Sequence, residues 1–445
     1  MRLSIDTTHK YAPDSVGKTR FIIDIRKVFL ICLFFIFLHP YSISLGGDGL
    51  SANYSFVLLP LFYFLLRRGV IRRPQKIYLL FMGLYSIIFV VASIYQLDLQ
   101  EYSLRRTISF FLFMTIFSFM FMKIDAEMVA AFKLAIVGIS VYFSLYTIST
   151  YFSAGGAALG ALAKTVVGSQ RFGFIYILAI WLVYQEKYFS RLWPILKYPV
   201  LFILLSGLLM TFSRSGIVAL LGSFGIFTVV NVIRWFRRPT HTLIRKAIVS
   251  ISILSVLIIA VVLFLPGTVE FFDQRLFSYF LNNSAVADDI SNPEASEGYR
   301  IFMIQKILGF VANNPLTGSG YLGVWILFSD HSGSAHNQYS DVLFRTGLPG
   351  FVLYLYLLFI LIKFLYTNER ALFWGTLGVL IYGLFHETFK ESQGAFVLTF
   401  LLGMLAQRRQ LANYASRRTI ERSLDTAQEY VTLRPHFRPE KKLPQ

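Results

Sequence analysis

Residues 348–366 read LPGFVLYLYLLFILIKFLY, a run of 19 residues in which Lys363 is the one charged side chain. A run of this length and composition predicts a helix that crosses a lipid bilayer, because a hydrocarbon core about 30 Å thick needs roughly 20 apolar residues. The whole chain has the same character, with 56% hydrophobic residues, 15% charged residues and a mean hydropathy of +0.60. These values exclude a soluble multidomain protein and predict an integral membrane protein without a separate soluble catalytic domain.

Eleven further apolar runs predict that the fold is an all-α polytopic membrane protein with about twelve transmembrane helices. Several runs are shorter than a perpendicular crossing requires, so their helices are expected to extend into the flanking polar residues. In chain order, the twelve runs are 28–45, 53–66, 77–97, 108–122, 128–152, 172–184, 198–212, 216–233, 247–265, 348–366, 371–385 and 395–406.

Lysine and arginine residues predict the orientation of these helices, because short cytoplasmic loops are enriched in both. An even number of spans puts the two termini on the same side. Of the 42 lysines and arginines, 31 lie on that side, which is therefore the predicted cytoplasm, and ten lie near the outer face. The remaining one, Lys133, lies within the run 128–152, near its cytoplasmic end. The predicted organisation is a cytoplasmic tail (1–27), nine helices (28–265), a large external loop (266–346), three helices (347–406) and a basic cytoplasmic tail (407–445).

The positive charge of the chain is mainly a consequence of this topology. The formal net charge is +18, which in a soluble protein would suggest nucleic-acid binding. Here most of the basic residues lie in the cytoplasmic turns and tails. They predict attraction of these tails to anionic lipid headgroups, and no nucleic-acid partner is expected.

Arginines on the outer side are candidate anion ligands, because orientation rules disfavour them there. Arg214 falls in the turn between spans seven and eight, with no polar residue in the flanking apolar helices to neutralise it. The alternative is an arginine at a helix end that extends toward the interface. Arg300 lies near the start of a stretch of the external loop, 298–311, with apolar residues at helical spacing. Instead of binding an anion, it could pair with Glu297 or Asp289. Further outer arginines that could extend the anion site are Arg105, Arg106 and Arg171.

His336 lies in the external loop, and an imidazole there could serve as a general base. The alternative is a loop histidine that is only hydrogen-bonded. No zinc site is expected, because His331 lies five residues before His336 and so forms no His-x-x-x-His pair with it, and because the loop contains no cysteine thiol.

A second polar cluster, His386-Glu387, lies at the outer end of span eleven, where we expect a structural hydrogen-bonding role. The sequence has no phosphate-binding loop and no Gly-x-Ser-x-Gly motif, so ATP use and acyl-serine chemistry are not expected.

The outer motifs together resemble those of the O-antigen ligase and O-antigen polymerase superfamily, over about residues 200–405. The pattern His-[Asn/Ser/Gln]-x9-Gly-x-x-Gly of that superfamily is matched without a gap. The residues that carry the resemblance are Thr211-Phe212-Ser213-Arg214-Ser215-Gly216, then Arg300, then Asn314-Pro315-Leu316-x-Gly318-x-Gly320, and finally His336-Asn337-x9-Gly347-x-x-Gly350.

The resemblance implies a membrane-embedded glycosyltransferase of the GT-C type that needs no metal or other cofactor. Such an enzyme would take a glycan from undecaprenyl diphosphate at the periplasmic face of a bacterial inner membrane and attach it, with inversion, to an acceptor hydroxyl. Arg214 and Arg300 would bind the diphosphate, because a guanidinium group binds phosphate oxygens bidentately. His336 would accept the proton of the acceptor hydroxyl. Asn337, Gly347 and Gly350 would be structural, the glycines allowing a tight turn into span ten.

The acceptor decides between two members of this class. A ligase would transfer the finished chain to lipid A core, whereas a polymerase would transfer it to the next carrier-linked repeat unit. Some polymerases carry paired Arg-x10-Gly motifs, and neither Arg275 nor Arg300 is followed by glycine at that spacing, which favours a ligase slightly. Other polysaccharide-assembly proteins are candidate partners. A lipid-linked glycan transporter is a third hypothesis, but it predicts more charges inside the spans and symmetry between the two halves of the chain.

Overall fold

The computed structural model describes residues 2–4, 22–38, 42–44, 51–53, 124–153, 173–186, 193–210, 213–237, 248, 252, 255, 296–319, 335–390 and 392–407. The predicted spans at 77–97 and 108–122 lie outside the described residues, as do nearly all of those at 53–66 and 247–265. Arg105, Arg106 and Arg171 are outside them too. The predictions for these segments and for the two tails therefore stay predictions.

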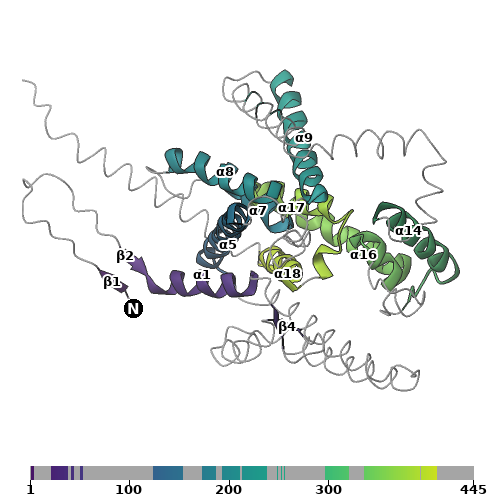
Figure 1. The fold of residues 1–445 in the computed structure, drawn as a ribbon. Coiled ribbons are helices and arrows are strands. Elements are labelled where there is room, and N and C mark those ends of the chain that lie inside the picture. The colour runs from purple at the N-terminus through teal and green to yellow at the C-terminus, as the bar shows by residue number, and fades with distance from the viewer. Residues whose placement is uncertain are drawn as a thin grey trace, which may run out of the picture.

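The described residues form a bundle of α-helices (Figure 1). Two short antiparallel strand pairs, which the apolar runs do not predict, flank the first helix: β1 (Arg2–Ser4) with β2 (Ile22–Asp24), and β3 (Ser42–Ser44) with β4 (Ser51–Asn53). The helices are α1 (Ile25–Leu38), α5 (Ala126–Ser153), α7 (Gly173–Gln185), α8 (Trp193–Met210), α9 (Arg214–Arg237), α14 (Ser296–Asn313), α16 (Gln338–Asn368), α17 (Arg370–Tyr382) and α18 (Ser392–Ala406), with a 3-10 turn, η4, at Thr388–Lys390.

The apolar runs predict most of these helices to within a few residues. Three of them are long and apolar enough to cross a membrane among the described residues: Ala126–Ser149, Ser215–Phe236 and Gln338–Asn368. Others are apolar but shorter, among them Gly173–Gln185 and Arg370–Tyr382. The chain is therefore a membrane protein. Within the described ranges three helices are long enough to span by length and composition, and the prediction of about twelve spans stays a prediction.

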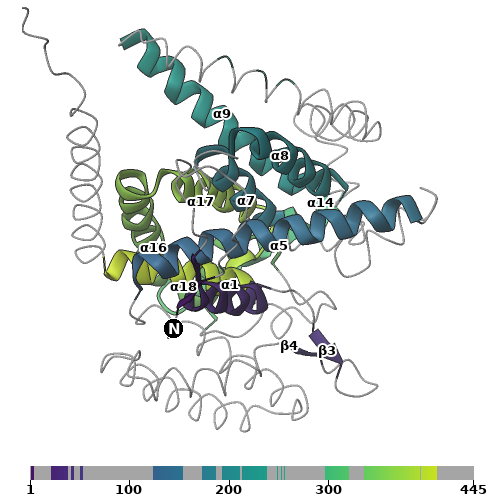
Figure 2. The same ribbon diagram turned by 90° about the vertical axis from the view of Figure 1, so that its left-hand side faces the viewer.

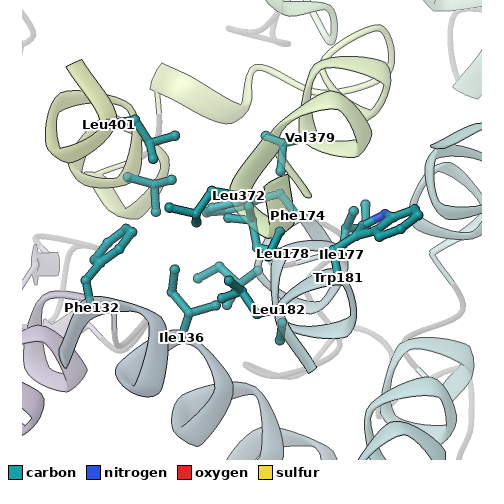
Figure 3. Close-up of a cluster of buried hydrophobic side chains, with 14 of the residues drawn as sticks. Phe132, Ile136, Phe174, Ile177, Leu178, Trp181, Leu182, Leu372, Val379 and Leu401 are labelled. Atoms are coloured by element: carbon teal, nitrogen blue, oxygen red, sulfur yellow. The ribbon is translucent and has the colours of Figure 1, made fainter. Parts of the chain in front are cut away.

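The core of the bundle is built around α7. Every residue of α7 from Gly173 to Val183 is buried, because α5, α8, α9 and α17 all pack against it. Figure 2 shows α5 between α1 and α7, and Figure 3 shows α7 side chains among those of α5 and α17. Trp181 stacks on Phe224 of α9 and donates a hydrogen bond to Ser223 Oγ over 2.9 Å. At Gly378 of α17, an added Cβ would lie 2.5 Å from the Ile177 side chain, so a small residue permits this close helix packing.

Helix ends gather at opposite ends of the bundle. At one, which we call the Lys133 end, the buried Lys133 Nζ lies 2.6 Å from both Glu186 Oε1, just after α7, and Glu369 Oε2, between α16 and α17. This pairing supplies carboxylate partners for the lysine that the sequence places inside a span. At the other, the His336 end, α7, α9 and α16 begin and α17 ends. The predicted outer motifs lie at the His336 end.

Candidate active site

Arg214 is the first residue of α9, and residues 213–216 at this helix start are called the Arg214 turn below. Ser213, just before the helix, caps it: the Ser213 Oγ accepts a hydrogen bond from Gly216 N over 3.2 Å, and its carbonyl accepts one from Ile217 N over 3.1 Å. Ser213 and Ser215 are both buried, and their hydroxyl oxygens are 3.2 Å apart. Arg214 thus stands at a helix N-terminus, where the helix dipole favours an anion.

His336 occupies a turn that leads into α16. Its φ is +50°, in the left-handed region that a non-glycine residue seldom adopts, and no other non-glycine residue among those described has a positive φ. The next residue, Asn337, caps α16 by accepting hydrogen bonds from Tyr339 N and Ser340 N at 2.9 and 3.0 Å. His336 itself is half-buried. The conformation at His336 costs free energy, so the surrounding contacts must impose it.

Those contacts come from the turn that follows α17, residues 383–390. Gln338 N donates to Gly383 O over 2.8 Å, and Asn337 Nδ2 donates to Leu384 O over 2.9 Å. In return, Gln338 Oε1 accepts from Phe389 N over 2.8 Å. On the other side of His336, the backbone N–H of Ala335 donates to a carboxylate oxygen of Glu387. The residues on both sides of His336 are therefore tied to one turn.

The same turn also reaches the start of α9. His386 is buried, and its Nε2 lies 2.7 Å from Ser215 Oγ. Its ring stacks on Tyr382 with centroids 4.6 Å apart. The Tyr382 ring in turn packs against Gly173, the first residue of α7, where an added Cβ would come within 3.0 Å of it. The structure thus brings the Arg214 turn and the His336 turn together through residues 382–389.

The glycine motif forms a second junction at this end. Gly347 interrupts α16 with φ +65° and ψ −171°, so α16 consists of two helical segments that meet at a kink. The loop after α14 packs into the kink: Leu348 N donates to Pro315 O over 2.8 Å, and Ser319 N donates to Phe344 O over 2.7 Å. The first segment of α16, residues 338–346, falls in the stretch predicted as external loop, where Asn337 caps a helix that is too polar to appear as an apolar run.

The helix α14 carries Arg300 and lies beside the first segment of α16 (Figure 1). Phe310 contacts Phe344, with ring centroids 5.1 Å apart, and Ala335 belongs to the same buried cluster as Met303. Arg300 lies in the first turns of α14. Its backbone is therefore held on a helix whose buried cluster includes Ala335, the residue that precedes His336.

A further outer arginine, Arg345, has a structural partner. Its Nε pairs with the buried Asp341, one turn earlier in α16, and lies 2.9 and 3.0 Å from the two carboxylate oxygens. Arg345 is therefore neutralised within its own helix.

Among the described residues, no group of three or more His, Cys, Asp or Glu side chains could hold a metal ion. Asp330 and His331 lie outside the described part of the chain.

The sequence did not predict the hydrogen bond of Ser215 with His386 or the role of Gln338. The signal for the first was weak: His386-Glu387 is a polar pair ending an apolar run, and nothing in its spacing connects it to Ser215, 171 residues earlier. Gln338 connects the start of α16 to the turn 383–390 through its backbone N–H and its side-chain oxygen. Nothing in the sequence indicates this role beyond the position of Gln338 after the Asn337 cap.

The described helices include three that are long and apolar enough to cross a membrane, and the polar motifs lie at one end of the bundle. Together they define a membrane protein with a candidate active site at its His336 end. A family model described as O-Antigen ligase matches residues 199–355, a segment that includes Arg214, Arg300, His336, Gly347 and Gly350. The resemblance to the O-antigen ligase superfamily that the motifs indicate is confirmed over this segment. The match supports a glycosyltransferase-like protein, a ligase or a polymerase. No curated protein matches the chain.

Proposed function

We propose that this protein moves a glycan from undecaprenyl diphosphate to a sugar hydroxyl at the periplasmic face of the bacterial inner membrane, as a ligase of the O-antigen type. The observation that carries the proposal is the joining of the Arg214 turn and the His336 turn through residues 382–389. A cation at a helix N-terminus and an imidazole in a constrained turn are the two groups that such a transfer requires. They come from segments far apart in the chain.

The arginines would bind the donor. A lipid diphosphate carries two or three negative charges, and guanidinium groups bind phosphate oxygens in pairs. Arg214 would also have the N–H groups and dipole of α9 beside it. Arg300, on the helix that packs against Ala335, would be the second ligand. As the leaving group departs, these cations would offset the negative charge that accumulates on the diphosphate, so no metal is required.

His336 would act on the acceptor. Its imidazole would take the proton from the acceptor hydroxyl while the hydroxyl oxygen forms a bond to the anomeric carbon of the donor. The bond between that carbon and the phosphate oxygen breaks, and its electron pair leaves with the lipid diphosphate. Attack opposite the leaving group inverts the configuration. The proton stays on the imidazole until His336 releases it to solvent after the transfer, and no covalent enzyme intermediate forms.

The distribution of basic residues supports the proposed orientation. The His336 end would face the periplasm and the Lys133 end the cytoplasm, where Lys363 near the end of α16 and Arg370 at the start of α17 would meet anionic lipid. Both termini would be cytoplasmic. The donor would then reach the site laterally through the outer leaflet. Other polysaccharide-assembly proteins would be partners at this face.

Ligase and polymerase share this donor chemistry and differ in the acceptor. To separate them, purified protein in proteoliposomes receives a carrier-linked repeat unit as sole substrate, and the products are resolved by size. A ligase is expected to make acceptor-linked product only after lipid A core is added. A ladder of chain lengths without lipid A core would instead establish a polymerase, and movement of the glycan across the membrane without any new bond would establish a transporter.

A further inference from the structure

His386 is a buried side chain that the proposed chemistry does not use. It follows α17 in the turn 383–390, and its ring is stacked on the buried Tyr382. Its Nε2 lies 2.7 Å from Ser215 Oγ, so one nitrogen of the ring is committed to the start of α9. Because its ring face is covered by Tyr382 and its Nε2 is engaged by Ser215, His386 is poorly placed to exchange protons with a substrate. The same contacts place it well to hold the start of α9 in position.

The segment that it holds is the Arg214 turn. Ser215 is the second residue of α9, and its hydroxyl also lies 3.2 Å from that of Ser213, the cap of the helix. A hydrogen bond at this position fixes the rotation of α9 about its axis and its displacement along it. The backbone position of Arg214 is therefore fixed relative to His386.

The turn that carries His386 is equally fixed relative to His336. The carbonyls of Gly383 and Leu384 accept hydrogen bonds from Gln338 N and Asn337 Nδ2, at 2.8 and 2.9 Å. The bonds on either side of His386 therefore connect α9 to the start of α16 through a single short turn.

We infer that His386 is a positioning residue: through Ser215 it sets the distance between Arg214 and His336, and so aligns the bound diphosphate with the general base. The inference rests on the proposed function and adds a residue that lies beyond the segment matched by the family model. A displacement of 1 Å between reacting groups costs roughly 100-fold in rate. His386 acts in this way without touching either substrate.

The test measures kcat and KM for the donor in four variants: His386→Ala, His386→Gln, Ser215→Ala and the double variant His386→Ala/Ser215→Ala. His386→Ala and Ser215→Ala are each expected to lower kcat by roughly 10- to 100-fold, with a smaller change in KM. The double variant is expected to be no worse than either single one, because both remove the same hydrogen bond. His386→Gln should stay near wild type, since an amide can still hydrogen-bond Ser215.

Ser223→Ala is the matched control, because Ser223 is also a buried serine of α9 and hydrogen-bonds Trp181 in the core, away from the site. It is expected to lower thermal stability while leaving kcat unchanged. Wild-type kcat in both His386→Ala and Ser215→Ala, or full additivity in the double variant, would overturn the inference alone. Absence of transfer by the wild-type protein would instead contradict the proposed function. If His386→Ala fails to fold, Ser215→Ala and His386→Gln decide.

Discussion

Replacement of His336 by asparagine is expected to lower the rate of glycan transfer by about 10²- to 10⁴-fold, the range that a positioned general base contributes. Asparagine is the appropriate substitute because it tolerates the left-handed backbone that His336 adopts, at φ +50°, and it cannot accept the proton. His336→Ala is expected to lose the same activity and, in addition, some stability from its strained backbone. Initial rates with reconstituted protein measure the effect.

A structural role for His336 predicts a different pattern. If the imidazole only supplied a hydrogen bond to its surroundings, His336→Asn and His336→Gln would restore that bond and keep most of the activity. The proposal requires that both stay inactive while their thermal stability and membrane insertion resemble those of the wild type. An active His336→Gln enzyme would remove His336 from the role of base.

Replacement of Gly347 by alanine is expected to destabilise the folded protein by about 3 kcal/mol or more. The backbone at Gly347, with φ +65° and ψ −171°, belongs to a region that is essentially restricted to glycine. An added Cβ would also lie 2.7 Å from Pro315 O and 2.8 Å from Leu316 O, both of which are backbone atoms that cannot move aside. The substitution should therefore separate the loop after α14 from the kink of α16.

Gly309→Ala is the matched control for Gly347→Ala. Gly309 is an exposed residue of α14, and nothing lies within 4 Å of a Cβ added there. Alanine at an exposed helical position is expected to stabilise by roughly 0.5–1 kcal/mol. Thermal unfolding of the two variants in the same detergent gives the comparison. Equal stability of Gly347→Ala and the wild type would show that the kink does not depend on glycine.

The helices of the bundle could be predicted from the sequence because each is an apolar run. The run 128–152 is α5 (Ala126–Ser153), and the run 216–233 lies within α9 (Arg214–Arg237). The loop helix expected at 298–311 is α14 (Ser296–Asn313). The start of α16 could not be predicted in this way. Residues 338–346 include Gln338 and Asp341, which are buried through hydrogen bonds and an ion pair and not by apolar character.

The site could be predicted only in part. Arg214 and His336 stood out locally, one as a cation on the disfavoured side and the other within a spaced motif. Their joining depends on Ser215 and His386, and a hydrogen bond between residues so distant in the chain leaves no periodicity or spacing to detect. Packing of α17 against α7 and α9 brings these residues together, and the hydropathy of a run does not encode which helix it packs against.

The central claim is that one site both binds a lipid diphosphate and transfers its glycan, and donor binding measured beside transfer tests it most directly. Proteoliposomes carrying wild type, Arg214→Ala or His336→Asn are given the carrier-linked glycan, first alone and then with acceptor. We expect Arg214→Ala to weaken donor binding by about 10- to 100-fold, the worth of a hydrogen-bonded charge pair. His336→Asn is expected to bind the donor as the wild type does and to transfer none of it. Unchanged donor binding in Arg214→Ala, or transfer by His336→Asn at the wild-type rate, would contradict the account.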